Sequence, residues 1–167
     1  TPLYSSAASD VYKRQAFAQA TYGPSASGVA LKDVDDGAGT TQPRLSFLLA
    51  DAGRLADWPE APLPDVDFNA FVEEGRGLVF QWQSRLELER DKTDKHETVI
   101  SPFVTAIHYE YYDAELKEWK VEEEPVNDAG ATTWKKPARI HLLFARGALK
   151  ATKVIDLPIK RSGASTP

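Results

Sequence analysis

The most regular pattern in the chain runs from residue 99 to residue 119, VISPFVTAIHYEYYDAELKEW, where apolar and polar positions alternate. Side chains on a strand point to opposite faces in turn, so one face here would carry mostly aromatic and β-branched residues. The expected inward set is Phe103, Thr105, Ile107, Tyr109 and Tyr111, and the expected outward set is Val104, Ala106, His108, Glu110 and Tyr112. Burying the inward set would stabilise the fold by about 25 cal/mol per Å² removed from water. The pattern predicts a central core strand that ends in a polar turn at Asp113.

A second pattern covers residues 77–90, GLVFQWQSRLELER. Such alternation is typical of an antiparallel strand with one face in water. The expected inward set is Leu78, Phe80, Trp82, Leu86 and Leu88, and the expected outward set is Val79, Gln81, Gln83, Arg85, Glu87 and Glu89. A charged turn at 91–97 follows, so we expect this strand and the central strand to pair as a hairpin.

Shorter segments complete the predicted strands. Residues 44–50, RLSFLLA, carry large apolar side chains at alternate positions and predict a strand. Residues 138–145 and 149–157 also alternate, on either side of a turn at Gly147, and predict a hairpin.

One segment favours a helix. Asp65 can cap a helix over residues 65–74, in which Phe68, Phe71 and Val72 would share a face. The prolines of the preceding segment WPEAPLPD prevent a long helix there. Together these patterns predict an α+β fold that is strand-dominated, with antiparallel β-sheets and little helix.

The first residues of the chain do not resemble part of a domain. Residues 5–15, SSAASDVYKRQ, match the in-frame translation of a common transposase-based sequencing adapter over eleven consecutive positions. We therefore interpret 1–15 as an artefactual tail that makes no specific contacts. The remaining length fits one globular domain at 16–160, with a disordered tail at 161–167. The match also predicts that the coding sequence continues upstream of Ala16.

Composition narrows the possible partners. The 167 residues carry a formal net charge of −5, which argues against nucleic acid, because a phosphate backbone is bound by basic surfaces. Cysteine is absent, so disulfides, thiolate metal sites and cysteine nucleophiles are excluded. No run approaches the ~20 apolar residues of a membrane helix, and no signal peptide is visible.

The sequence shows no catalytic or metal-binding pattern. His96, His108 and His141 lack the i, i+4 spacing of a zinc-binding helix, and no nucleophile-elbow or phosphate-loop motif is present. The aspartates at 33, 35 and 36 resemble the start of a calcium loop, but Gly37 stands where a further ligand is needed. An acidic hairpin loop explains them better. We predict no catalytic residues, no metal, no cofactor and no enzymatic activity.

Aromatic side chains leave a binding role open. Trp58, Trp119 and Trp134 lie outside the expected core faces and could form a platform for sugars, whereas Trp82 is expected in the core. A stand-alone β-sheet module that binds carbohydrate or a small ligand, in the periplasm or outside the cell, is therefore an alternative function. A second alternative function is that of a hydrolase with an unrecognised site, because aspartate and glutamate are abundant.

Twelve residues of the second half form an ordered motif: Val104, Thr105, Ile107, Tyr109, Tyr111, Tyr112, Asp113, Trp119, Pro137, Ala138, Ile140 and Leu142. This order resembles the J-type minor pseudopilins of the type II secretion system. In that family a strand of the pattern Val-Thr-x-hydrophobic-x-aromatic-x-Tyr-aromatic-Asp is followed by Trp and then by a Pro-Ala strand. Looser similarity extends over about 44–158. The pattern does not separate a secretion pseudopilin from a minor pilin of a true pilus.

The resemblance implies a β-rich head in the periplasm that acts in mechanical assembly and performs no chemistry. It implies a membrane-inserted N-terminal helix, absent from this chain, whose basic leader a prepilin peptidase removes. The implied partners are other minor pseudopilins, with which a J-type component forms a hetero-oligomer at the pseudopilus tip. The motif residues are then structural, and the partner-binding surface stays open.

Overall fold

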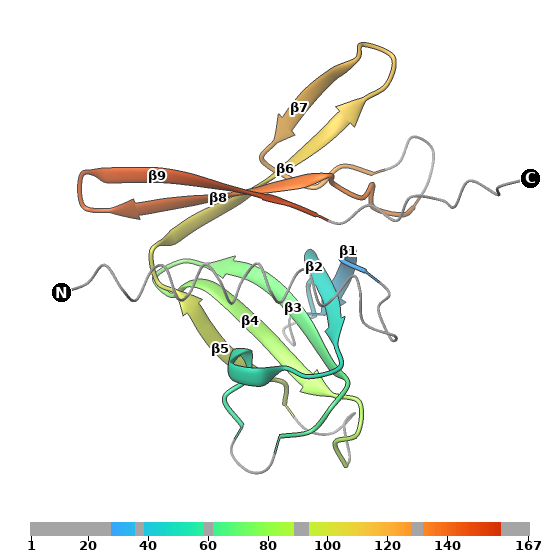
Figure 1. The fold of residues 1–167 in the computed structure, drawn as a ribbon, viewed down its shortest axis with the longest axis vertical. Coiled ribbons are helices and arrows are strands. Elements are labelled where there is room, and N and C mark those ends of the chain that lie inside the picture. Colours follow the sequence, from blue (N-terminus) through green and yellow to red (C-terminus); the bar gives the residue numbers. More distant parts are fainter. Residues whose placement is uncertain (1–27, 36–38, 59–61, 89–93, 128–131, 158–167) are drawn as a thin grey trace, which may run out of the picture.

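The structure, a computed structural model, describes residues 28–35, 39–58, 62–88, 94–127 and 132–157. These residues form two antiparallel β-sheets and one short 3-10 helix at Gly53–Leu55 (Figure 1). The prediction of a strand-dominated fold with antiparallel sheets is confirmed, and the described ranges contain no α-helix. Both predicted tails, 1–15 and 161–167, lie outside the described residues.

The first sheet is a meander of five strands that pair in chain order: β1 (Ala30–Asp35), β2 (Thr41–Leu49), β3 (Val66–Glu73), β4 (Gly77–Ser84) and β5 (His96–Ser101). The second sheet has the order β7-β6-β8-β9 and consists of β6 (Val104–Asp113), β7 (Glu118–Glu122), β8 (Arg139–Arg146) and β9 (Leu149–Asp156). Figure 1 shows the second sheet lying across the first, with β5 continuing into β6.

One hydrophobic core lies between the two sheets and takes side chains from both. A void of only about 10 Å³ remains between Leu45, Ala70, Leu78 and Phe80 of the first sheet and Ile107, Ile140 and Leu142 of the second. Side chains of the two sheets therefore fill almost all of the space at this point of the core.

Three phenylalanines anchor the first sheet in this core. Phe47 on β2 stacks on Phe68 of β3 with ring centroids 5.2 Å apart, and Phe80 on β4 meets both rings edge-on. Such pairs contribute about 0.5–1.5 kcal/mol beyond the area they bury. The strand predicted at 44–50 is confirmed by β2, whose alternate residues face this core.

The helix predicted over residues 65–74 is wrong, because these residues form β3. β3 pairs with β2 on one edge and with β4 on the other, and this double pairing outweighs a weak helical pattern. Phe68 lies in the core, whereas Phe71 lies on the opposite face, 3.9 Å from the guanidinium carbon of Arg44. Asp65 precedes the strand with a φ of 53° and caps no helix.

β4 ends at Ser84, earlier than the alternation up to residue 90 predicts. Leu78, Phe80 and Trp82 of β4 face the core, but Leu86 and Leu88 lie beyond the end of the strand, and Leu88 is 90% exposed. The strand ends because a turn begins there. The Ser84 hydroxyl donates to the carbonyl of Pro64 at 2.6 Å, and the Ser84 N–H donates to the Glu87 carboxylate at 2.8 Å.

The other face of β4 is less exposed to solvent than the alternation predicts. Val79 and Gln83 are buried, although they are outward positions. Phe71 is the direct partner of Val79 on β3. Arg44 stacks on Phe71 and donates to Gln81 at 3.2 Å. Large side chains of neighbouring strands therefore cover part of this face.

The predicted hairpin between β4 and the central strand is correct only for residues 99–101, which belong to β5. β4 pairs with β5, and the chain then turns a corner at Pro102 and enters the second sheet as β6. The corner passes so close to the start of β4 that a Cβ added to Gly77 would lie 2.2 Å from the carbonyl oxygen of Ser101. The alternating stretch is thus divided between two sheets. Alternation reports which side of a strand is buried, but not which strand is its partner.

A β-bulge changes the inward and outward positions at the start of β6. The register with β8 shifts between Val104 and Ala106, which inserts an extra residue into β6. Val104 is consequently buried, whereas Phe103 and Thr105 are exposed, contrary to prediction. Beyond the bulge the predicted inward residues Ile107, Tyr109 and Tyr111 are buried.

The hairpin predicted on either side of Gly147 is confirmed by β8 and β9. Arg146 and Leu149 pair at its end and leave a two-residue loop, in which Gly147 has a φ of 60°. A positive φ at the first loop position is typical of a type II′ turn, which glycine adopts without strain.

Candidate docking surface

Most of the twelve motif residues build the core of the second sheet. Val104, Ile107, Tyr109, Tyr111, Pro137, Ile140 and Leu142 are all buried. Burial, with a further contribution from the neighbouring Tyr111, raises the pKa of the Tyr109 phenol to about 12. The Tyr111 hydroxyl accepts the N–H of Val126 at 3.3 Å. Packing accounts for these residues.

Two further motif residues join β6 to β8. The Thr105 hydroxyl donates to the carbonyl of Leu143 at 3.3 Å. The Ala138 N–H donates to the carbonyl of Glu110 at 2.9 Å, and the Ala138 carbonyl accepts the N–H of Leu157 at 2.8 Å. Both residues therefore have structural roles.

Asp113 closes the turn between β6 and β7. Its Oδ1 accepts the N–H groups of Glu115 and Leu116 at 3.0 and 3.1 Å, and its Oδ2 accepts from the Lys120 ammonium at 2.8 Å. These bonds favour the ionised carboxylate. Led by the bond from Lys120, they lower the pKa of Asp113 to about 2.

We expect Asp113 to contribute to the loss of stability in acid. Its pKa in the folded chain, about 2, is below the unfolded value of about 3.9, so its contribution is complete above the unfolded value. The contribution is lost as the pH falls through the folded pKa. NMR titration should give Asp113 a pKa near 2, and a higher one in Lys120→Gln. Asp113→Asn should lose unfolding free energy less steeply than wild type below about pH 4; equal slopes would contradict this role.

Tyr112 and Trp119 are the aromatic residues of the motif that lie outside the core. Each is 45% exposed, and they face each other across β6 and β7 on the side of the sheet away from the core. Their ring centroids are 5.1 Å apart, with 58° between the ring planes. The guanidinium of Arg139 on β8 lies over Trp119, 4.4 Å from the ring centroid. Three strands thus contribute to one aromatic surface.

Arg139 connects this aromatic pair to a buried carboxylate. Its Nη1 lies 3.4 Å from Oε1 of Glu110, and its Nε donates to Asp156 at 2.9 Å. Glu110 is only 6% exposed, although it was predicted to face outward, and its Oε2 lies 2.8 Å from Nε2 of His141. A buried carboxylate requires compensating partners, and Arg139 and His141 supply them. His108 lies directly opposite His141 on β6, a cross-strand position.

We call this surface the outer-face cluster and define it as Glu110, Tyr112, Trp119, Val121, Arg139 and His141. Val121 is exposed and lies opposite Glu110. Tyrosine, tryptophan and arginine are enriched among the residues that carry most of the energy of protein interfaces. Because Arg139 is held by two carboxylates and an aromatic ring, little of its conformational freedom remains to be lost on binding. The cluster is therefore suited to docking another protein.

The remaining candidate aromatic residues contact different neighbours in separate places. Trp58 packs on the buried Trp82 with ring centroids 4.6 Å apart, and Trp82 stacks on His96 at 4.4 Å. Trp134 donates its Nε1–H to the Asp33 carboxylate at 2.8 Å. Trp58 and Trp134 therefore do not extend the aromatic surface around Trp119.

The aspartate and histidine residues considered above as metal ligands lie in strands or next to a strand connection. Asp33 and Asp35 lie on β1, next to the β1–β2 connection, and Asp36 lies outside the described residues. His96 begins β5, with Nε2 3.2 Å from Glu87. Within the described ranges, no group of three or more histidine, aspartate or glutamate residues is arranged to hold a metal ion.

Sequence reasoning missed the polar half of the cluster. Arg139 and His141 are 29 and 31 residues from Glu110 in the chain, and only the pairing of β6 with β8 brings them together. A local sequence motif cannot predict such a cross-strand contact, because the contact depends on which strands pair. The alternation instead predicted Glu110 to be a solvent-facing residue.

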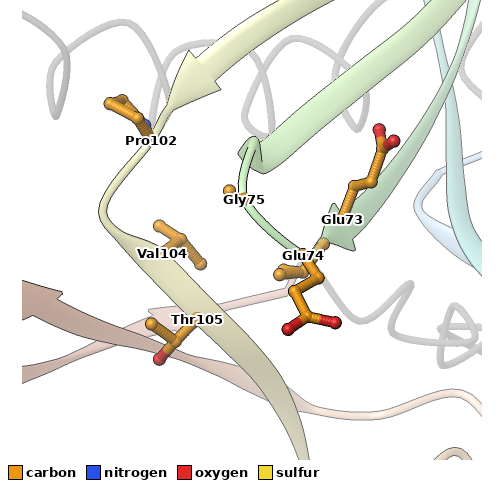
Figure 2. A pocket seen from close by; sticks show the side chains of 8 residues that line it. Glu73, Glu74, Gly75, Pro102, Val104 and Thr105 are labelled. Carbon is orange, nitrogen blue, oxygen red and sulfur yellow. The ribbon is translucent and has the colours of Figure 1, made fainter.

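A hollow of about 470 Å³ lies beside the β3–β4 turn and the β5–β6 corner (Figure 2). Val104 and Thr105 line it from one side, and Glu73 and Glu74 from the other. Glu73 is bound to Arg76 at 2.6 Å, and Figure 2 shows the two carboxylates pointing in opposite directions. Small-ligand sites bring several polar groups toward one point, so this hollow is a weaker candidate than the outer-face cluster.

Comparison of the chain with known protein families, curated proteins and solved structures finds no match in any of the three. Among the residues that the structure describes, no helix is long and apolar enough to cross a membrane.

Proposed function

We propose that this chain is the head of a J-type minor pseudopilin, which binds other minor pseudopilins at the tip of a type II secretion pseudopilus. In this proposal a membrane-inserted helix upstream carries the head in the periplasm, and the head acts by binding rather than by catalysis. The observation that carries the proposal is the exposure of Tyr112 and Trp119. Both belong to the motif, yet neither packs in the core.

The surroundings of these two residues support a docking role. Arg139 holds Trp119 by a cation–π contact and is itself bound to Glu110 and Asp156. Its charge is therefore already compensated, so a partner needs no matching carboxylate. The chemistry that fits the cluster is an apolar protein surface with a polar rim, which would cover both rings and remove them from water. The core residues of the motif build the sheet that presents these rings.

Trp119→Ala tests the proposal. Hot-spot residues cost about 2 kcal/mol or more when truncated, so binding should weaken by about 30-fold or more. The measurement is titration calorimetry of the head against the heads of the other minor pseudopilins of the same system. Because Trp119 is 45% exposed, we expect the melting temperature to change little.

Leu86→Ala is the matched control, since Leu86 is also exposed but lies beyond β4 of the first sheet. It should bind like wild type. A wild-type head that binds none of these partners, or a Trp119→Ala variant that binds as tightly as wild type, would contradict the proposal.

The alternative of a sugar-binding module would use the same exposed rings of Tyr112 and Trp119. The angle of 58° between their planes provides no flat double platform, so a sugar could stack on only one of them. Binding of the wild-type chain to a glycan array, lost in Trp119→Ala, would favour this alternative over assembly.

A further inference from the structure

The second sheet ends on two strands of opposite charge. On one edge, β9 carries Lys150 and Lys153, while the carboxylate of its Asp156 is already bound by Arg139. On the other edge, β7 carries Glu118 and Glu122 around a single lysine, and Glu123 and Glu124 follow it directly. Within the described residues no further strand pairs with either edge, and Figure 1 shows the β6–β7 and β8–β9 hairpins projecting in different directions.

The hydrogen bonding of β9 defines which of its backbone groups face the free edge. The Leu157 N–H donates to the Ala138 carbonyl, and in an antiparallel ladder hydrogen-bonded pairs alternate with pairs that are not bonded. The β9 residues bonded to β8 are therefore 149, 151, 153 and 155. The two-residue loop closed by Arg146 and Leu149 gives the same assignment. The backbone groups of Lys150, Thr152, Val154 and Asp156 consequently point to the free edge.

The same reasoning applies to β7. Since alternate residues of β8 bond to β9, Arg139 and His141 bond toward β6, where their partners are Glu110 and His108. The odd-numbered residues of β6 then bond to β7, and their partners are Glu122, Lys120 and Glu118. The backbone groups of Trp119 and Val121 are left facing the free edge.

Apolar side chains accompany these free backbone groups on the outer face of the sheet. Trp119 and Val121 on β7 are exposed, and so is Val154 on β9. In an antiparallel pairing that sets Val121 opposite Val154, Glu122 falls opposite Lys153 on the other face. One register thus joins an apolar pair and an opposite-charge pair, each of which stabilises neighbouring strands.

We propose that β9 of one copy of this chain pairs antiparallel with β7 of a second copy, so that the four-stranded sheet continues from one molecule into the next. β7 and β9 run in opposite directions within the sheet, so a second copy in the same orientation continues the antiparallel order. β9 carries a net positive charge, whereas β7 and the two glutamates that follow it carry a net negative charge. Pairing two copies of β9, or two copies of β7, would bring strands of like net charge together, so charge favours the head-to-tail arrangement.

Engineered cysteines test the pairing, because the chain contains no natural cysteine. Val121→Cys and Val154→Cys, prepared separately as full-length chains, should form an interchain disulfide when mixed and oxidised, since paired residues lie within disulfide reach. Each variant alone should remain uncrosslinked. A disulfide in Val154→Cys alone would indicate β9–β9 pairing, and no disulfide in the mixture would mean that the edges do not meet in this register; either result overturns the proposal.

A proline provides a second, independent test. Val154→Pro removes only an N–H that faces the free edge, and proline is tolerated on edge strands in that position. Sedimentation velocity at up to about 1 mM should show wild-type association that weakens with added salt, whereas Val154→Pro should stay monomeric. Val154→Ala keeps the N–H and should still associate.

Two outcomes of sedimentation would overturn the pairing: a wild-type chain that stays monomeric, and a folded Val154→Pro variant that associates like wild type. If Val154→Pro fails to fold, disulfide formation between the mixed Val121→Cys and Val154→Cys chains decides whether the strands pair. Val154 lies outside the outer-face cluster, so Val154→Pro and Val154→Ala leave the proposed docking of other pseudopilins unchanged. The two proposals can therefore fail separately.

Discussion

Replacing Gly77 with alanine is expected to destabilise the domain by roughly 3 kcal/mol or more. Gly77 adopts a φ of 82°, which costs an L-residue about 1–2 kcal/mol. An added Cβ would also lie 2.2 Å from the Ser101 carbonyl oxygen and 2.7 Å from the Cα of Pro102. Both contacts are backbone, so relief requires the β5–β6 corner to move, and overpacking of this kind costs about 1–3 kcal/mol more.

Gly75→Ala is the matched control for this substitution. Gly75 has a similar φ of 79°, but nothing lies within 4 Å of the position its Cβ would occupy. Its cost should be limited to the backbone strain of about 1–2 kcal/mol. The measurement is urea-induced unfolding of both variants and wild type. Equal losses in the two variants would show that the close approach of β4 to the corner does not constrain the fold.

Replacing Phe68 with alanine is expected to cost about 3–5 kcal/mol, the usual range for removing a fully buried aromatic side chain. Phe68 is 0% exposed and contacts the rings of both Phe47 and Phe80. The core here is closely packed, so the cavity left behind cannot collapse without moving two strands. Free energies of unfolding from denaturant titration measure the loss.

Phe71→Ala serves as the comparison, because it distinguishes the strand from the helix that the sequence pattern favoured. In a helix Phe68 and Phe71 would share a face and cost similar amounts. In β3 they lie on opposite faces, and Phe71 is partly exposed beneath Arg44. Its loss should cost about 1 kcal/mol, which includes the cation–π contact. Similar losses for the two variants would contradict the strand.

The hairpin of β8 and β9 could be predicted from the sequence because all its determinants are local. Alternation defines two faces, and Gly147 supplies the positive φ that a tight turn requires. β2 was predictable for the same reason. β3 could not be predicted, because the apolar residues at 68, 71 and 72 also fit one face of a helix. Its pairing with β2 and β4 on both edges makes this segment a strand.

The candidate site was predictable only in part. The alternation predicted Tyr112 to face outward and Trp119 to lie outside the core, and both side chains are exposed. The alternation predicted that Glu110 faces solvent. The pairing of β6 with β8 instead places Glu110 against Arg139 and His141, which bury it. Residues about 30 positions apart acquire such neighbours only through strand register, which no local pattern encodes.

By itself, then, the sequence determined the strand-rich composition of this protein and most of the residues that face its core. Period-two alternation and charge are properties of neighbouring residues, so they can be read along the chain. The tertiary structure alone decided that the stretch from 99 to 112 divides between two sheets at the corner packed on Gly77. It also decided the bulge at the start of β6 and the meeting of Trp119 with Arg139. These features depend on which strands pair and in which register, and that choice is made by packing across the whole core.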